Sequence, residues 1–198
     1  MRRSRRPIAW LCAAATLMSI AACTPGKSPA VPTSPSPVAV RRSVADGAPY
    51  LCHFIPQAAV ADLTGYIGPY KAGSGERDPE GRGCVISNDE QSLFITRYYE
   101  SAPRQVIENL IEFGENRNPV KLPEELGKGE ISDFQSRFYQ YRKAGAWFRC
   151  GSNNSLITIT VKRNPARDQD HDLVQLMKIA ERRFAEMFKC KLGGPPPG

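Results

Sequence analysis

The clearest pattern along the chain is the strict alternation of apolar and polar residues over positions 157–162. Ile157, Ile159 and Val161 fall on one side, and threonines and a lysine fall on the other. A period of two predicts a β-strand with one buried face. Residues 146–150 precede it across a Gly-Ser-Asn-Asn turn, which predicts a neighbouring antiparallel strand.

Three further apolar runs predict strands. Residues 84–87 and 93–99 favour a β-hairpin around Asn88-Asp89-Glu90. Residues 134–141 predict one more strand, with Phe134 on one face and the tyrosines on the other, and Lys143-Ala144-Gly145 predicts the turn that follows it.

The longest helical pattern covers about residues 170–189, where one apolar stripe recurs at helical spacing. Aspartates crowd its start and lysines its end, which suits the helix dipole. Two shorter helices are predicted after Pro56 and after Pro103. The order of elements predicts an α+β domain, an antiparallel sheet with about three helices packed on one face.

The N-terminus has the pattern of a lipoprotein signal peptide. Four arginines precede an apolar run over residues 8–20, which is shorter than the ~20 residues of a membrane-spanning helix. Ser19-Ile20-Ala21-Ala22-Cys23 then matches a lipobox. We therefore expect residues 1–22 to be removed and Cys23 to be lipidated, with export by either the general or the twin-arginine route.

The mature chain divides into three predicted parts. Residues 23–48 form a tether rich in Pro and Ser, which lacks the apolar content to pack. Residues 49–192 form the α+β domain, and residues 193–198 a disordered Gly/Pro tail.

Charge argues against a nucleic-acid partner. The chain has 27 Lys and Arg against 20 Asp and Glu, but four of the arginines lie in the signal peptide, so 23 remain in the mature protein. This small excess gives no electrostatic case for binding nucleic acid.

Four cysteines remain after lipidation, and an even number in an exported domain indicates disulfides. Three pairings are open. We favour Cys52 with Cys84 and Cys150 with Cys190, because each of these bonds joins a helix to its neighbouring strand.

The sequence predicts no catalytic residue, no cofactor and no metal site. Its two histidines, His53 and His171, stand far apart in the chain, and the aspartates around His171 suit a helix N-terminus better than a cation site. The aromatic residues Tyr139, Tyr141 and Trp147 are candidates for a ligand groove on the sheet.

Several short motifs resemble a known family: the lipobox at Cys23, Leu51-Cys52 before a short helix that ends in Leu63-Thr64-Gly65, and Gly83-Cys84-Val85-Ile86. With the tether and the closing helix, they resemble actinobacterial envelope lipoproteins that carry a cysteine-paired domain of unknown function. More distantly, the chain resembles the extracellular sensor domains of mycobacterial receptor kinases. The resemblance implies two disulfides on an α+β core and no catalytic residues.

From these features we expect a non-catalytic protein anchored through Cys23 to the extracytoplasmic face of the cell membrane. It would bind an unidentified ligand or partner protein of the envelope. An envelope hydrolase and a structural subunit of an envelope assembly are the alternatives.

Overall fold

The computed structural model describes residues 39–74, 81–109, 117–135 and 139–196. They belong to one compact unit, Pro37–Gly198. The predicted signal peptide and Cys23 lie outside the described residues.

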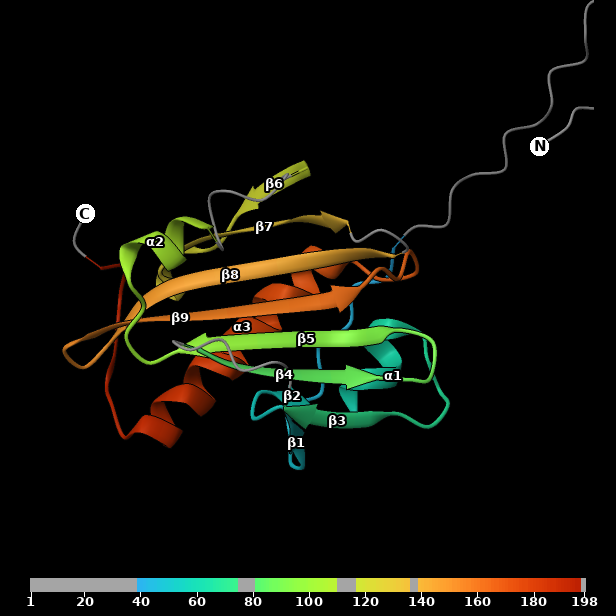
Figure 1. Cartoon of the computed structure of the whole chain (residues 1–198). Coiled ribbons are helices and arrows are strands. Elements are labelled where there is room, and N and C mark those ends of the chain that lie inside the picture. The colour runs from blue at the N-terminus through green and yellow to red at the C-terminus, as the bar shows by residue number, and fades with distance from the viewer. Residues whose placement is uncertain (1–38, 75–80, 110–116, 136–138, 197–198) are drawn as a thin grey trace, which may run out of the picture. The chain divides into compact units, whose positions relative to one another are not determined.

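An antiparallel sheet forms the body of this unit, and Figure 1 shows it face-on. Its order is β3-β4-β5-β9-β8-β7-β6, and β10 (Leu192–Gly193) pairs with the end of β8. The strands are β3 (Lys71–Ser74), β4 (Arg82–Ser87), β5 (Ser92–Tyr99), β6 (Arg117–Lys121), β7 (Lys128–Gln135), β8 (Gln140–Cys150) and β9 (Asn153–Lys162). A separate ribbon pairs β1 (Tyr50–Leu51) with β2 (Ile55–Pro56).

The helices lie on both faces of the sheet. The long helix α3 (Gln169–Phe188) passes behind it in Figure 1, and α1 (Ala59–Thr64) packs into the same core. The short helix α2 (Arg104–Ile107) instead packs with Tyr99 and Leu156 in a second cluster. Leu156 and the core residue Ile157 are neighbours on one strand and point to opposite faces. A turn of 3-10 helix, η2 (Glu124–Leu126), precedes β7.

Aromatic rings join α3 to the sheet at the centre of the main core. Phe184 lies 5.5 Å from Phe148 and 6.0 Å from Tyr98 between ring centroids, both edge to face. Tyr98 in turn meets Phe54 at 5.3 Å. Such pairs add about 0.5–1.5 kcal/mol each beyond their buried area.

Most of the predicted elements are confirmed. The fold is α+β with an antiparallel sheet, and the hairpin forms as β4 and β5, where the Asn88 side chain accepts hydrogen bonds from the backbone N–H of Glu90 and Gln91. Strand β9 forms as predicted, but the expectation of a single buried face is wrong, because Leu156, Thr158 and Thr160 on its second face are buried as well.

The strand predicted over residues 134–141 is wrong. The chain reverses between β7 and β8, so that Phe134 pairs with Tyr141 on the same face. The predicted turn, Lys143-Ala144-Gly145, lies within β8 instead. Glycine and lysine made this stretch resemble a turn, but Ala144 and Ala146 are fully buried beneath α3, where small side chains let the helix approach.

Two disulfides tie the helical segments to the sheet. Cys52 bonds to Cys84 at the start of β4, and Cys150 at the end of β8 bonds to Cys190 just after α3. The Cα atoms of each pair are 5.4 Å apart, a normal separation for a disulfide. The favoured pairing is therefore confirmed.

The chain packs onto the domain earlier than residue 49, the predicted start. Residues 39–46, here called the strap, run beside α3 in the same direction. Val40 forms a parallel bridge with Arg167, the backbone N–H of Val44 donates to the Gln175 side chain at 2.7 Å, and Asp46 accepts from Arg182 at 2.5 Å. At the other end, Gly193, predicted to lie in the tail, pairs with Arg149.

One acidic side chain of α3 is buried. Glu181 is 4% exposed, and its Oε1 has no hydrogen-bond partner among the described residues. Burial, and then the nearby charge of Glu125, raise the pKa of Glu181 to about 8. The native protein therefore holds this proton through a pH range in which the unfolded chain has lost it.

Removing either disulfide should destabilise the domain by about 3–4 kcal/mol, because the sequence separations of 32 and 40 residues close long loops in the unfolded chain. The double variants C52S/C84S and C150S/C190S, compared with wild type by urea unfolding, test this. A loss of less than about 1 kcal/mol in the free energy of unfolding would show that the disulfides constrain the unfolded chain little.

Glu181→Gln should stabilise the protein increasingly as the pH rises. The raised pKa means that wild-type stability falls from about pH 4.5 to about pH 8 as the unfolded chain, but not the native one, loses the proton. We expect a gain of at least about 1 kcal/mol at pH 8 and little gain at pH 4.5. Glu186→Gln, an exposed position on the same helix, is the control and should show no such trend.

Candidate functional site

A polar cleft of about 400 Å³ opens at the N-terminus of α3. We call it the arginine–aspartate cleft; it is lined by Ala39, Asn118, Pro119, Val120, Arg142, Arg163, Arg167, Asp168, Gln169 and Asp170. A second hollow of similar volume adjoins it and shares Val120, Asp168 and Asp170. Arg41 of the strap and His171 line this second hollow.

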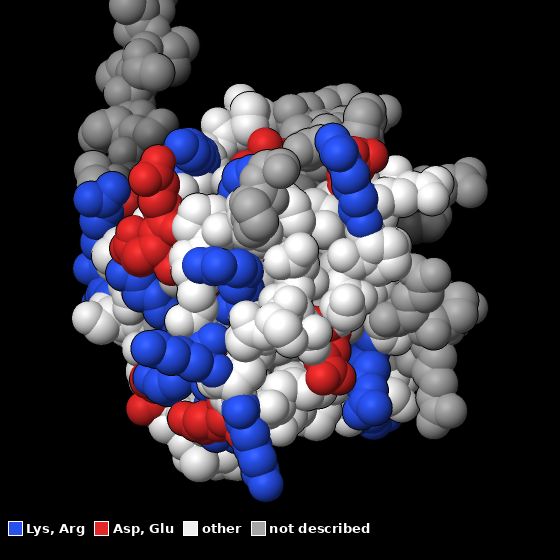
Figure 2. All heavy atoms as spheres, turned by 90° about the vertical axis from the view of Figure 1, so that its left-hand side faces the viewer, with Lys and Arg blue, Asp and Glu red and all other residues white. Residues whose placement is uncertain are grey.

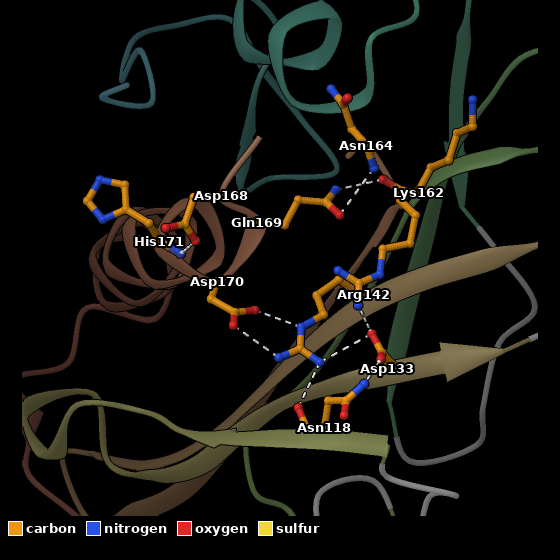
Figure 3. A network of polar contacts seen from close by, with 10 residues as sticks. Asn118, Asp133, Arg142, Lys162, Asn164, Asp168, Gln169, Asp170 and His171 are labelled. Atoms are coloured by element: carbon orange, nitrogen blue, oxygen red, sulfur yellow. Dashed lines mark hydrogen bonds and ion pairs between the residues drawn. The ribbon is translucent and has the colours of Figure 1, made fainter. Parts of the chain in front are cut away.

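Arg142 forms the floor of the cleft, and its side chain is only 3% exposed. Figure 3 shows its guanidinium group between Asp170 and Asp133. It lies on β8 and points toward α3, where Nε and Nη2 donate to the two carboxylate oxygens of Asp170 at 2.7 and 3.1 Å. Its Nη1 donates to the carbonyl of Asn118 at 2.9 Å and to Asp133 at 3.2 Å. Each of the three nitrogens of the planar guanidinium therefore donates to an acceptor.

Asp133 links the floor to the rim. It lies opposite Arg142 on β7, and its Oδ1 accepts from both Arg142 and Arg163 while its Oδ2 accepts from the Asn118 side chain at 2.8 Å. Burial acts to raise the pKa of this carboxyl, but the Asn118 hydrogen bond and the two arginine charges outweigh it and lower the pKa. Asp133 is thus ionised at neutral pH.

The connection from β9 to α3, residues 163–168, forms another part of the cleft wall, and hydrogen bonds hold it in place. Gln169 accepts from the Asn164 backbone N–H at 3.2 Å and donates to the Lys162 carbonyl at 2.8 Å. The Asn164 side chain also donates to the carbonyls of Asp62 and Leu63 at the end of α1. These bonds fix the connection between two elements of the core, so the first turn of α3 has a defined position.

The strap packs against the residues just before α3, beside the cleft. Arg41 donates from Nε to Asp168 at 2.6 Å, while the other oxygen of Asp168 caps α3 by accepting from the His171 backbone N–H. These two bonds lower the pKa of Asp168. Arg167 is paired with buried Asp172 at 2.6 Å and also donates to the carbonyl of Arg42. The strap is therefore part of the wall and not a detached linker.

The charges of the domain are mixed rather than segregated. On the face seen in Figure 2, basic and acidic side chains are interspersed. Along α3, Arg182 pairs with Asp46 and Lys178 with Glu125. This face therefore offers no single-signed surface for a polyelectrolyte, in keeping with the composition.

The residues of the predicted aromatic groove are spread from Tyr139, just before β8, along that strand to Trp147. Tyr139 is 36% exposed and donates to the carbonyl of Glu90, and buried Tyr141 lies 6.1 Å from Phe134 between ring centroids. Trp147 is six residues beyond Tyr141, about 20 Å along the strand, and packs in the α2 cluster. The structure thus groups the two tyrosines at one end of the sheet and places the tryptophan at the other; their role in binding stays a prediction.

The two histidines do not meet. His171 lines the second hollow, whereas His53 packs edge-on against Tyr98 at 6.0 Å, beside the far end of α3. Within the described ranges, no group of three or more His, Cys, Asp or Glu is placed to hold a metal ion. None of the helices described is long and apolar enough to cross a membrane.

The sequence pattern missed the residues that build the cleft. Arg142 falls between the strand predicted over residues 134–141 and the turn predicted over residues 143–145, and neither prediction places it beneath α3. The aspartates at the start of α3 are one signal, because carboxylates that become buried need cationic or N–H partners. Nothing in the spacing identified which arginine on the sheet would meet them.

We found no family model that matches the chain, and no curated protein or solved structure with significant similarity to it.

Arg142→Met should destabilise the domain by about 3 kcal/mol, because it leaves Asp133 and Asp170 without their shared cation. Urea unfolding at pH 7 measures the loss. Since the pKa of Asp133 is lowered, the contribution of its ion pairs to the free energy of unfolding is present above about pH 4 and is lost as the pH falls further. The difference in unfolding free energy between Arg142→Met and wild type should therefore become smaller in acid.

Arg149→Met is the matched control, because Arg149 is an exposed arginine on the same strand. We expect a change within about 0.5 kcal/mol. Equal losses for the two variants would mean that the ion-pair network contributes nothing specific.

Proposed function

We propose that this protein is a non-catalytic lipoprotein, held by lipid on Cys23 at the extracytoplasmic face of the cell membrane, and that its domain binds a ligand or partner of the cell envelope in the arginine–aspartate cleft. The observation that carries the proposal is the position of this cleft, where the strap, which belongs to the predicted tether, joins the domain. Val40 and Arg41 bond to the connection and the helix that form its wall.

The lipobox and the Pro/Ser tether support the anchor. The resemblance to actinobacterial envelope lipoproteins, expected from the motifs around Cys23, Cys52 and Cys84, agrees with this location. Two acyl chains bind a membrane firmly where a single chain gives marginal attachment.

The rigidity of the cleft supports binding. Arg142 and Arg167 are almost fully buried and ion-paired, so their positions are set before any ligand arrives. A site whose side chains are already ordered loses less conformational entropy on binding. The cleft also has the size of common small-molecule sites, about 300–1,000 Å³.

The experiment is native mass spectrometry of the full mature protein extracted from its own membranes. We expect acyl mass on Cys23, the loss of four hydrogens for two disulfides, and a bound ligand or partner. Val120→Trp should remove that bound species, because Val120 lines both hollows and is 41% exposed, so the larger ring fills the space without altering a charge.

Ile67→Trp is the control for added aromatic surface, since Ile67 is 90% exposed and lines neither hollow. It should retain the bound species. The proposal fails if Val120→Trp binds as wild type does, if the Cys23→Ala variant remains membrane-bound, or if the protein shows a turnover activity that one point substitution abolishes.

A further inference from the structure

The arginine–aspartate cleft has N–H groups without a partner among the described residues, whereas its carboxylates are already bonded. The carboxylate oxygens at the cleft already accept: both oxygens of Asp170 from Arg142, and both of Asp168 from Arg41 and the His171 backbone. Asp133 below them is likewise engaged at both oxygens. The negative charge of each of these carboxylates is therefore already offset by a bonded arginine.

Arg163 provides the open donors. It follows the end of β9, its side chain is 38% exposed, and one nitrogen, Nη2, is bonded to Asp133. Its other guanidinium N–H groups have no acceptor among the described residues. A guanidinium presents its N–H groups as a fork that fits two oxygens of a carboxylate or phosphate.

The surroundings favour negative charge at this point. Arg142 and Arg167 also line the cleft but are already ion-paired with Asp170 and Asp172, so the attraction comes from Arg163 and from α3, a helix of 20 residues that directs its N-terminus at the cleft. The dipole of such a helix stabilises an anion near its first turn. Asp170 is 39% exposed but is neutralised by its two bonds to Arg142, so it does not present an uncompensated charge.

We infer that the cleft recognises an oxyanion, a phosphate or carboxylate group of its envelope ligand, and that Arg163 is the residue that contacts it. This deepens the proposed function and rests on it for the cleft being the ligand site. The shared chemistry is a group with at least two acceptor oxygens. Its phosphate and carboxylate forms are distinguished by the test.

The test is a titration of the ¹⁵N-labelled full mature protein in detergent micelles, followed by the Nε–H signal of Arg163 and the backbone signals of Gln169 and Asp170. The probes are inorganic phosphate, acetate and chloride at constant ionic strength. We expect saturable shifts with phosphate, acetate or both, and none with chloride. A response to phosphate alone assigns a phosphate group, and a response to acetate alone assigns a carboxylate.

Arg163→Gln should weaken the binding at least 10-fold, read from the signals of Gln169 and Asp170. Arg42→Gln is matched in charge: Arg42 is exposed on the strap and its side chain lines neither hollow, so its loss should change the affinity less than 2-fold. Equal weakening in both variants, or shifts that chloride reproduces, would overturn the inference.

The two proposals fail separately. If Val120→Trp removes the native ligand while phosphate and acetate leave Arg163 unmoved, the cleft is the ligand site and the oxyanion inference is wrong. If the oxyanion probes bind at Arg163 but Val120→Trp leaves the native bound species in place, the oxyanion site is real and the proposed function of the cleft is wrong.

Discussion

The burial of Arg142 within a β-strand is the constraint on which this end of the molecule depends. A guanidinium that is 3% exposed must have its charge and its donors satisfied by the protein. Three elements do so: β6 through a carbonyl, β7 through Asp133 and α3 through Asp170. The requirement sets the register of α3 on the sheet, since a shift of the helix by one residue would carry Asp170 away from its partner.

Contacts elsewhere in the fold hold α3 along its length and at its C-terminus. Phe184 packs it into the aromatic core, the disulfide from Cys190 ties its C-terminus to β8, and the strap runs beside it as far as Arg182. The first turn of α3 is therefore fixed by covalent, apolar and ionic contacts together. A polar cleft built on that turn inherits its rigidity, which is what a ligand site requires.

The elements with strong local patterns were predictable from sequence, and those decided by tertiary contacts were not. Periodicity identified β9 and α3, and cysteine positions favoured the correct disulfides. The reading of residues 143–145 as a turn failed because local composition favoured a turn while the core beneath α3 favoured small residues in a strand. The cleft was missed for a related reason. Arg142 and Asp170 are 28 residues apart, and no local pattern reports a pair that meets only across a helix–sheet interface.

The direction of the strap has a mechanical consequence. Because the strap runs parallel to α3, a pull on the chain that precedes it loads the bonds of Val40 and Arg41 first and the bonds nearer Asp46 afterwards. Peeling the chain as far as Cys52 would release about 40 Å of extended backbone. The bond from Cys52 to Cys84 then passes the load into β4, so the covalent crosslink is the point at which the sheet itself begins to bear the strain.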